Sequence, residues 1–518
     1  MTQMPTPHNE RMTGPSIQPL TFGTAGLRGP MRDGPDGMNV ETVTRATWAV
    51  AKVLKDRCLG GSTVVVGRDA RHQSDDFALA TAEVLAAEGF SVVLLPDPAP
   101  TPVVAFAVRH LRAVAGVQIT ASHNPPADNG YKVYLDGGMQ IVPPSDRDIE
   151  SAMTSAPTDI ARSEVDPVDT ELVHDYVRRA ATVRRTTGDV RVALTPMHGV
   201  GGEVALRVLS EAGITDVHTV AEQFAPDPDF PTVAFPNPEE PGATDLLLAL
   251  AAKVDAEVAI ALDPDADRCA VGVPTPTGWR MLTGDETGWL LGDYVLSKTE
   301  SRDVMAASVV ASTVVSSCML AAIAASHGAQ HVETLTGFKW LARADAGLPG
   351  STLVYAYEEA IGHCVDPASV RDKDGISAAV LVCDLVVALR QNGRTLLDEL
   401  DALARAHGVH TTTAVSVPAD AAVMPRLRAE PPGLIGGEPV EVSDLLERRG
   451  QQRTDALIYT GERARVAIRP SGTEPKIKAY LEIRLPPSDD VAAARVVAAR
   501  LLDELRADVV DLLQRGPN

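Results

Sequence analysis

The feature that most constrains the fold is an alternation of short β-rich segments with longer helical segments. Residues 63–66 form an apolar β-rich run, residues 74–87 follow with a helical pattern, and residues 91–95 are β-rich again. The same order recurs within residues 191–220 and within residues 304–334. Short strands separated by helices are typical of strand–helix–strand units with parallel or mixed sheets. We therefore expect several α/β domains.

Local signals predict where these elements begin and end. Ser74 is a suitable N-cap for the first of these helices, and Gly89 is a suitable residue to end it. In the third repeat we expect a strand at 304–310, a helix at 313–326 and a strand at 331–334. Each helix should then be flanked by two strands.

The pattern changes near Gly408. Three β-rich runs follow, at 409–417, 464–468 and 477–485, and a long helical pattern begins at about Asp489. This order predicts a smaller α+β domain at the C-terminal end of the sequence.

Two further segments are candidate boundaries. Residues 156–167 are rich in serine, proline and acidic residues, and residues 225–241 contain six prolines. The second segment lies inside one of the α/β repeats, so it could instead be a long surface loop.

The charge of the chain restricts its partners. With 47 basic and 69 acidic residues among 518, the formal net charge is −22. Such a surface repels a phosphate backbone, so we expect no nucleic-acid partner. A small phosphorylated substrate would also be repelled, and its phosphate would need a local basic pocket.

Cysteine usage and hydropathy favour the cytoplasm. The five cysteines contain no CxxC pair, which argues against a disulfide framework or a structural zinc site. Residues 1–15 are polar and interrupted by prolines, unlike a signal peptide. The longest apolar stretch, 376–389, is interrupted by Asp384 and is too short for a membrane span, so we expect a buried helix.

A serine lies at the end of a predicted strand. The sequence TASHNP, residues 120–125 (the serine loop), follows the apolar run 114–119. Loops at strand ends often hold catalytic residues in α/β sheets, and Ser122 beside His123 could be an activated nucleophile. Asn-Pro-Pro is also strong turn chemistry, so a plain tight turn is the alternative. The absence of a GxSxG elbow disfavours a serine hydrolase.

Three aspartates at alternate positions follow another predicted strand, 258–262. Asp263, Asp265 and Asp267 lie in the sequence DPDADR, residues 263–268 (the aspartate loop). Converging carboxylates suit a hard cation such as Mg²⁺, although a plain acidic turn is possible. An EF-hand is excluded because its sixth and twelfth positions would be arginine and proline. Arg268 could hold a phosphate that the metal also polarises.

Two other loops are polar in a suggestive way. RPSGTEPK, residues 469–476 (the arginine loop), combines basic, hydroxyl and glycine residues that could cradle a phosphate, or it could be a polar hairpin turn. YEEAIG, residues 357–362 (the glutamate loop), could bind sugar hydroxyls, although its residue types alone favour a solvated turn. Glycine-rich segments with arginine at 23–29 and 67–71 suit phosphate contacts but are neither a P-loop nor a dinucleotide fingerprint.

Taken in order, these motifs resemble the α-D-phosphohexomutase superfamily, which includes phosphoglucomutases and phosphomannomutases. GTAGLRG, GRDAR, NGYK at 129–132 and TGFK at 336–339 extend the resemblance to nearly the whole chain. The resemblance implies four domains around a central cleft, three α/β with mixed sheets and a smaller C-terminal α+β domain. We place them at 1–175, 176–300, 301–407 and 408–518, with one key loop in each.

The resemblance also implies a mechanism. Ser122 would be phosphorylated, and Asp263, Asp265, Asp267 and a phosphoserine oxygen would hold Mg²⁺. The phosphoryl group would pass to a small phosphorylated sugar through a bisphosphate, with a sugar bisphosphate such as glucose 1,6-bisphosphate as primer. The implied catalytic residues are Ser122, His123, Lys132, Arg28 and Arg268. The implied substrate contacts are Glu358, Ala360, Gly337, Lys339, Lys373, Arg469, Ser471, Gly472, Thr473 and Lys476. A general acid–base role for Lys132 would need a lowered pKa, so a donor role is simpler.

One departure affects the substrate. Many members of the superfamily have serine where this chain has Ala360, two residues after Glu358. YEEAIG followed by VRDKDG is similar to the branch that handles glucose and pentose phosphates. We therefore expect a hexose or a pentose phosphate, and mannose less. A non-catalytic sugar-phosphate-binding relative and a metal-dependent phosphatase are the alternatives, and the sequence does not distinguish a monomer from a dimer.

Overall fold

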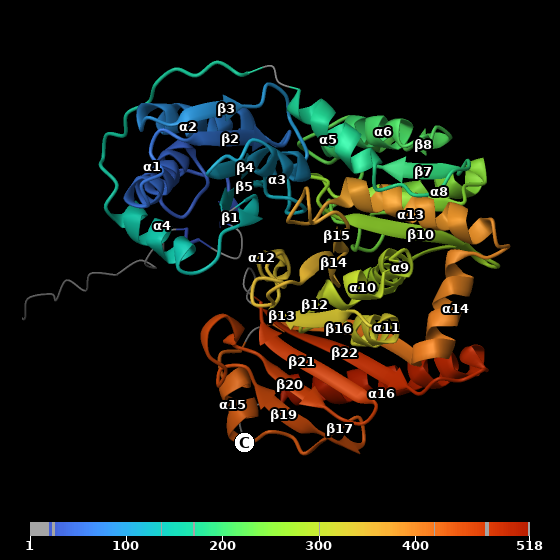
Figure 1. The fold of residues 1–518 in the computed structure, drawn as a ribbon. Helices are drawn as coiled ribbons and strands as arrows, with labels where there is room; N and C mark the ends of the chain where they lie inside the picture. The colour runs from blue at the N-terminus through green and yellow to red at the C-terminus, as the bar shows by residue number, and fades with distance from the viewer. Residues whose placement is uncertain are drawn as a thin grey trace, which may run out of the picture.

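The computed structural model describes residues 20–22, 26–135, 137–168, 171–299, 301–418, 420–471 and 476–515. In this part of the chain four main sheets follow one another, and each forms the centre of one lobe (Figure 1). Three of the sheets mix parallel and antiparallel neighbours, and the last is antiparallel. The expected three α/β domains and smaller C-terminal α+β domain are therefore confirmed.

The first sheet has the strand order β1-β5-β4-β2-β3, with β6 beside β5. Its strands are β1 (Gly26–Pro30), β2 (Thr63–Arg68), β3 (Ser91–Leu94), β4 (Ala115–Ile119), β5 (Asp128–Leu135) and β6 (Met139–Gln140). Its helices are α1 (Val40–Asp56), α2 (Ser74–Ala87), α3 (Thr101–His110) and α4 (Ser145–Thr154). Strand β4 is parallel to β2 but antiparallel to β5, and the serine loop connects β4 to β5.

The second sheet repeats this arrangement in the order β11-β10-β9-β7-β8. Its strands are β7 (Val192–Thr195), β8 (Val217–Thr219), β9 (Val258–Leu262), β10 (Cys269–Thr275) and β11 (Gly278–Met281). Its helices are α5 (Leu172–Ala181), α6 (Gly201–Glu211), α7 (Ala221–Phe224) and α8 (Asp245–Val254). The aspartate loop connects β9 to its antiparallel neighbour β10, the same topological position as the serine loop in the first sheet.

The third sheet has the order β13-β12-β14-β15. Its strands are β12 (Ser308–Thr313), β13 (Gln330–Thr334), β14 (Thr352–Glu358) and β15 (Gly362–Cys364). Its helices are α9 (Gly284–Ser297), α10 (Arg302–Ala307), α11 (Met319–His327), α12 (Phe338–Leu341), α13 (Gly375–Arg390) and α14 (Leu396–His407). The glutamate loop connects β14 to β15, again at a parallel-to-antiparallel change. The buried helix expected at 376–389 is α13, which also packs against α5 and α6 of the second domain.

The fourth sheet is antiparallel, in the order β16-β22-β21-β20-β19. Its strands are β16 (Val409–Pro418), β19 (Glu441–Asp444), β20 (Leu457–Thr460), β21 (Ala464–Pro470) and β22 (Lys476–Leu485), with a small β17 (Leu434–Ile435) and β18 (Glu438–Pro439) pair nearby. Its helices are α15 (Val423–Ala429), a short 3-10 helix (Gly450–Gln452) and α16 (Val491–Gln514), which packs against β16 and β22. The arginine loop connects β21 to β22.

Buried polar contacts dock the fourth sheet on the third domain. Arg465 of β21 donates hydrogen bonds to backbone oxygens of the loop 314–318, at 2.7 and 3.3 Å. Glu482 of β22 accepts a hydrogen bond from Ser317 Oγ at 2.6 Å, and His410 Nδ1 lies 2.8 Å from the same carboxylate oxygen. We call this set of contacts the domain junction.

The strand predicted at 304–310 is wrong in its first half. Residues Arg302–Ala307 form α10, and β12 begins only at Ser308. Ser301 accepts a hydrogen bond from Val304 N and thereby caps the short helix. The apolar run therefore crosses from a helix into a strand.

The helix predicted at 313–326 also begins later, at Met319. Thr313 and Ser316 both turn their hydroxyl groups toward Glu359, each at 2.9 Å. Hydroxyl side chains that find such partners favour irregular backbone over a helix. Residues 314–318 are therefore a loop, whose backbone oxygens and Ser317 make contacts of the domain junction.

The predicted cap of α2 differs as well. Ser74 is the first helical residue and not the N-cap, because its hydroxyl donates to Asp69 Oδ1 at 2.7 Å. The N-cap position is taken by Gln73, whose φ is 60°.

The limits of the four domains stay a prediction. Helix α9 lies within the range 176–300 that we assign to the second domain, but it packs against α11 and β14. Within the described residues, no helix combines the length and the apolar character that a membrane crossing requires.

Candidate active site

The serine loop holds Ser122 in a strained and buried position. The residue has a left-handed backbone, with φ of 51°, and its side chain is almost fully buried. Its Oγ donates a hydrogen bond to Asp263 Oδ2 at 2.7 Å and lies 3.1 Å from His123 Nδ1. Ser122 N is fixed by Thr120 Oγ1 at 2.8 Å. The serine of the first sheet and the aspartate loop of the second therefore meet.

Arg71 fixes the backbone of the serine loop by hydrogen bonds. Its guanidinium donates hydrogen bonds to four backbone oxygens of residues 122–128, at distances between 2.6 and 3.2 Å. The side chain is buried, and Asp69 Oδ2 lies 3.3 Å from its Nε. The GRDAR segment is suggestive of a phosphate contact in the sequence, but this arginine is occupied in holding the backbone around Ser122.

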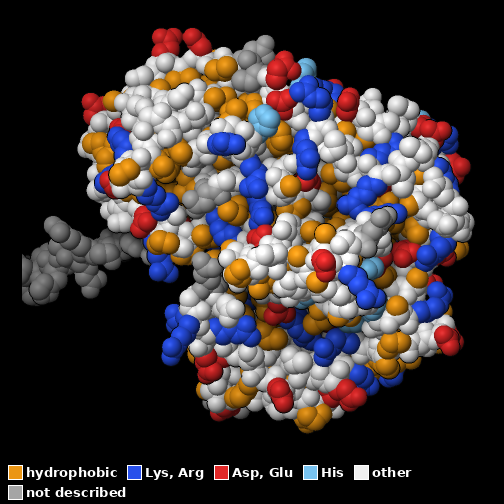
Figure 2. Space-filling view, viewed as in Figure 1, with side chains coloured by type: hydrophobic (Ala, Val, Ile, Leu, Met, Phe, Trp, Pro, Cys, Tyr) orange, Lys and Arg blue, Asp and Glu red, His pale blue; other side chains and the backbone are white. Residues whose placement is uncertain are grey.

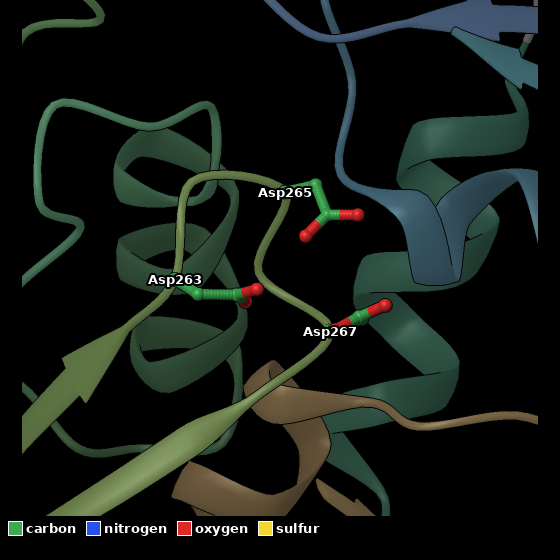
Figure 3. Close-up of side chains that lie close together, drawn as sticks. All are labelled: Asp263, Asp265 and Asp267. Carbon is green, nitrogen blue, oxygen red and sulfur yellow. The ribbon is translucent and has the colours of Figure 1, made fainter. Parts of the chain in front are cut away.

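The three aspartates converge in a fully buried cluster (Figure 3). One oxygen from each of Asp263, Asp265 and Asp267 lies within 4.8 Å of the others. In the described part of the chain, Asp265 Oδ1 and Asp267 Oδ1 accept no hydrogen bond. Buried carboxylate oxygens with unused acceptor capacity suit a hard divalent cation. The residues present therefore fit a Mg²⁺ ion.

Electrostatics divide the three carboxyl groups. Burial and the negative charges of Asp265 and Asp267 raise the pKa of Asp263 well above its usual value. Burial alone would also raise the pKa of Asp267, but Lys132 and Lys373 outweigh it and lower that pKa. The cluster is thus only partly compensated by the protein's own cations, which is a further reason to expect a bound cation.

Two lysines supply this partial compensation. Lys132 Nζ donates hydrogen bonds to Asp265 Oδ2 at 2.6 Å and to Asp267 Oδ2 at 2.8 Å. Lys373 Nζ lies 3.3 Å from the same Asp267 oxygen. Burial tends to lower the pKa of Lys132, but these carboxylates raise it overall, which favours the donor role over general acid–base catalysis.

Arg268 links the aspartate loop to the glutamate loop. Its backbone N donates to Asp263 Oδ1 at 3.0 Å, and its backbone forms a bridge with Gly362. Its Nε lies 3.9 to 4.0 Å from the nearest oxygens of Asp267 and Asp263 and, within the described residues, makes no hydrogen bond. Burial opposes its charge, but Glu358 and the aspartates raise its pKa, so the guanidinium is a stable positive charge.

Arg28 lies beside the serine loop, and His123 lies within it. Arg28 Nη1 donates to Asn124 Oδ1 at 3.0 Å, and burial lowers its pKa. Burial, followed by the positive charge of Arg268, lowers the pKa of His123 well below its ordinary value. His123 is therefore a neutral imidazole near neutral pH, able to exchange a proton with Ser122 Oγ.

The glutamate loop presents its two carboxylates differently. Glu359 is fixed by the hydroxyls of Thr313 and Ser316, each at 2.9 Å. Burial raises the pKa of Glu358, against the opposite effect of Lys373 and Arg268. Glu358 therefore lies in the electrostatic field of the two cations that also face Asp267, whereas Glu359 supports the loop.

Lys373 is positioned by the aspartates on either side of it. Asp372 accepts hydrogen bonds from Tyr134 OH at 2.9 Å and from Gln140 Nε2 at 2.7 Å, both in the first domain. Asp374 accepts one from Tyr176 OH of α5 at 2.8 Å. The third domain thus delivers Lys373 to the aspartate loop through ties to the first and second domains.

The predicted residues of the TGFK segment lie farther from the aspartates. Gly337 has φ of 101° and leads into α12, which lies close to β6 of the first sheet. Lys339 is buried, and burial lowers its pKa. The described contact with the aspartate cluster is indirect, because Phe338 packs its ring 5.6 Å from Lys373 Nζ.

The arginine loop lies at one end of the fourth sheet. Arg469 stacks on Tyr480 at 5.7 Å and donates a hydrogen bond to its hydroxyl at 3.2 Å. Ser471 N donates to the backbone oxygen of Lys476 at 2.8 Å, which closes the described part of the loop. Gly472 and Thr473 lie outside the described residues. Lys and Arg side chains gather along the hollow between the fourth domain and the upper lobes (Figure 2), as expected for a basic pocket in an acidic protein.

A cavity of about 580 Å³ adjoins the glutamate loop between the second, third and fourth domains. Its lining includes Glu239, Glu359, Ala360, Lys478 and Tyr480. Four residues that contact or line the site were not predicted from the sequence: Glu239, Lys478, Arg71 and Asp372. Arg71 and Asp372 do lie inside recognised motifs, whereas Glu239 lies in the proline-rich segment 225–241, whose composition gave no sign of chemistry.

Comparisons with known proteins cover nearly the whole chain. The family domains described as Phosphoglucomutase/phosphomannomutase, alpha/beta/alpha domains I, II and III match residues 19–159, 174–277 and 283–406. The C-terminal domain of the same family matches residues 419–501.

Individual relatives have several substrate names. A Haemophilus influenzae protein named Probable phosphomannomutase is 41% identical over 479 residues, covering 89% of this chain and 96% of that protein. The mouse protein named Phosphopentomutase is 35% identical over 525 residues, covering 91% and 84%. A Staphylococcus aureus Phosphoglucomutase is 31% identical over 507 residues, covering 91% of each.

A solved structure has the same fold. The phosphoglucomutase/phosphomannomutase family protein from Burkholderia thailandensis superimposes with a TM-score of 0.74 at 21% identity, covering 96% of this chain and 98% of that one.

Proposed function

The chain belongs to the phosphoglucomutase/phosphomannomutase family and is a phosphosugar mutase of the intramolecular phosphotransferase type, and we propose that Ser122 carries the transferred phosphoryl group. The observation that supports this most is the position of Ser122 Oγ, 2.7 Å from Asp263 and beside two buried carboxylates with unused acceptor oxygens. A hydroxyl in such a place can exchange a phosphoryl group whose charge a cation shares.

Asp263, Asp265, Asp267 and an oxygen on Ser122 would hold a Mg²⁺ ion. When bound there, Mg²⁺ supplies Lewis-acid stabilisation of the charge on the phosphoryl oxygens. Arg268 neutralises part of the same charge, and Lys132 fixes two of the aspartates by direct hydrogen bonds.

The remaining loops bind the sugar phosphate. Glu358 accepts hydrogen bonds from sugar hydroxyls, and Lys373 binds phosphate or hydroxyl oxygens beside it. Arg469, Ser471 and Lys476, with Gly472 and Thr473, hold the phosphate that does not react. After the first transfer the sugar bisphosphate turns in the cleft, and its other phosphate returns to Ser122. A sugar bisphosphate such as glucose 1,6-bisphosphate primes the serine.

For the substrate we propose a sugar 1-phosphate and the corresponding 6-phosphate, with glucose as the hexose. Phosphopentomutase activity on ribose or deoxyribose 1-phosphate is the second candidate, since the YEEAIG and VRDKDG segments favour that branch and the mouse relative has that name. Mannose 1-phosphate is included in the test because the Haemophilus influenzae relative is named Probable phosphomannomutase. We also propose a cytoplasmic location, which five free cysteines support.

A coupled assay tests the mechanism and the substrate together. Glucose, mannose, ribose and deoxyribose 1-phosphates are supplied with Mg²⁺, with and without glucose 1,6-bisphosphate. We expect isomerisation that needs Ser122, so Ser122→Ala should lower turnover by roughly 10⁴-fold or more. Full activity of Ser122→Ala over many turnovers would refute the phosphoserine. Inorganic phosphate released in step with product would indicate a phosphatase.

Intact mass offers a second measurement on the same protein. Wild-type protein treated with glucose 1,6-bisphosphate should gain the mass of one phosphate, and Ser122→Ala should not.

A further inference from the structure

The proline-rich segment 225–241 follows α7 and contacts the first domain near its start and the aspartate loop near its end. Near its start, Asp229 Oδ1 lies 2.7 Å from His72 Nε2 of the first domain. The ring of Phe230 packs 4.9 Å from the guanidinium of Arg71, the residue that clamps the serine loop. Near its end, Glu239 Oε2 lies 3.7 Å from Arg268 Nη1. A segment of the second domain thus contacts both the support of Ser122 and the arginine of the aspartate loop.

The backbone that presents Glu239 is fixed. Pro236 and Pro238 are buried on either side of Asn237. Asn237 accepts hydrogen bonds from Glu239 N through its side chain at 3.2 Å and from Glu240 N through its backbone at 3.0 Å. Proline removes backbone freedom, so little entropy is lost when this segment binds a ligand. The backbone at Glu239 is therefore held in place before any substrate arrives.

The carboxylate of Glu239 has acceptor capacity to spare. The 3.7 Å separation from Arg268 is an ion pair without a direct hydrogen bond. Among the residues that the structure describes, no group donates a hydrogen bond to this carboxylate, and 38% of the side chain is exposed. The exposed part lines the 580 Å³ cavity that Ala360 also lines.

The chemistry of the neighbours limits what Glu239 can bind. Partial burial raises the pKa of Glu239, the positive charge of Arg268 opposes this rise, and the negative charges of Glu359 and Glu358 add to it. A carboxylate in this acidic corner would repel a phosphate but accept hydrogen bonds from hydroxyl groups. The side chain of Ala360, at the neighbouring position of the cavity, has no hydrogen-bonding group. Of these two residues that line the cavity, Glu239 is therefore the one whose side chain can accept a hydrogen bond from a sugar hydroxyl.

We propose that Glu239 is a specificity-determining residue that accepts a hydrogen bond from a hydroxyl group of the bound sugar phosphate. This inference rests on the proposed function, because it assumes that the sugar lies between the serine loop and the arginine loop. It adds a contact from the second domain to those expected from the glutamate loop. For Glu239 to affect specificity, the hydroxyl that it binds must differ in presence or orientation among the glucose, mannose, ribose and deoxyribose phosphates.

The test is a thermodynamic cycle between protein and substrate. The carboxylate of Glu239 and single hydroxyl groups of the sugar are removed separately and then together. Wild type and Glu239→Ala are assayed for kcat/KM on the preferred sugar 1-phosphate and on its monodeoxy analogues. A hydrogen bond to a charged acceptor predicts a 10- to 100-fold loss for Glu239→Ala on the full sugar. For one analogue, which lacks the bound hydroxyl, the same substitution should change kcat/KM less than about threefold, because the two losses share one contact.

Two further variants make the result decisive. Glu239→Gln keeps the size of the side chain and should lose less activity than Glu239→Ala. Glu222→Gln, at an exposed glutamate of α7 in the same domain, should match wild type.

Either of two results would overturn the inference. Unchanged kcat/KM in Glu239→Ala would show that the residue does not touch the sugar. An equal loss on the full sugar and on every deoxy analogue would show that Glu239 acts only through Arg268. These failures differ from failure of the proposed function, in which wild type itself would isomerise none of the sugar phosphates in a Ser122-dependent way.

Discussion

The aspartate loop and the domain junction are both buried and both depend on carboxylates, but their electrostatics are opposite. In the aspartate loop, burial and two neighbouring carboxylates raise the pKa of Asp263. In the domain junction, burial opposes ionisation of Glu482, yet His410 and Ser317 lower its pKa to about 2. The first region keeps carboxylate oxygens without a hydrogen-bond donor among the described residues, whereas the main carboxylate contact of the second region is made between domains. The same substitution, carboxylate to amide, should therefore have opposite effects on stability in the two regions.

The largest expected difference is in catalysis. Asp263→Asn should lower kcat by about 10³-fold at saturating Mg²⁺, because it removes a proposed metal ligand that also accepts the Ser122 hydrogen bond. Glu482→Gln should lower kcat less than about fivefold, since Glu482 contacts the loop 314–318 and not the aspartates. Both values come from the coupled assay. Equal losses would mean that the two regions are not functionally separate.

The next effect is on stability at the domain junction. Glu482→Gln should lower the free energy of unfolding by about 2–3 kcal/mol, because an amide is a weaker acceptor for the donors of Ser317, Cys318 and His410. Urea denaturation measures the change. The control is Glu441→Gln, at an exposed residue of β19, which should stay within about 0.5 kcal/mol of wild type. An unchanged free energy of unfolding in Glu482→Gln would contradict the proposed difference between the domain junction and the aspartate loop.

A smaller effect of opposite sign is expected at the aspartate loop. Without metal, Asp263→Asn should raise the free energy of unfolding by about 1 kcal/mol, because it relieves repulsion among three buried carboxyl groups. The amide can still accept from Arg268 N and can donate to Ser122 Oγ. Melting temperatures in EDTA and in Mg²⁺ provide the measurement. Mg²⁺ should stabilise wild type more than the variant, and a destabilised variant in EDTA would contradict the argument.

The smallest expected effect is on the pH dependence of these differences. Glu482 has a lowered folded pKa, so its stabilisation is complete above the unfolded pKa near 4.5 and is lost only below it. Asp263 has a raised folded pKa, so its ionisation costs stability as the pH rises above about 3.8. Between pH 7 and pH 5 in EDTA, the Asp263→Asn gain should therefore shrink. A gain that stays constant over this range would contradict the raised pKa of Asp263.

The sequence places the serine loop and the aspartate loop directly after predicted strands, but that these loops share one cleft was implied only by the resemblance to the superfamily. Ser122 lies after β4 and Asp263 after β9, and in each sheet the following strand is antiparallel. Alternate carboxylates after a buried strand are visible without any knowledge of the fold. Glu358 also lies at the end of a strand, β14, but its residue types alone favoured a solvated turn, and only the resemblance made it a predicted site residue.

Contacts that depend on how domains pack could not be predicted in this way. Lys373 is visible in the RDKDG segment, but its ties through Asp372 to Tyr134 join residues 238 positions apart. Glu239 reaches Arg268 only because the proline-rich segment folds back across the second domain. The misplaced strand at 304–310 has a local cause, since Val304 is apolar yet 57% exposed on α10. Apolar residues predict burial only on average.

The left-handed backbone of Ser122 has a consequence for which amino acid can carry the phosphoryl group. Threonine has the same hydroxyl chemistry, but a β-branched side chain is a genuine outlier at a φ of 51°. Arg71 holds that conformation through four backbone oxygens, so the loop cannot easily relax to suit a larger residue. The backbone conformation therefore favours serine over threonine at position 122, although both side chains carry a hydroxyl group that could accept a phosphoryl group.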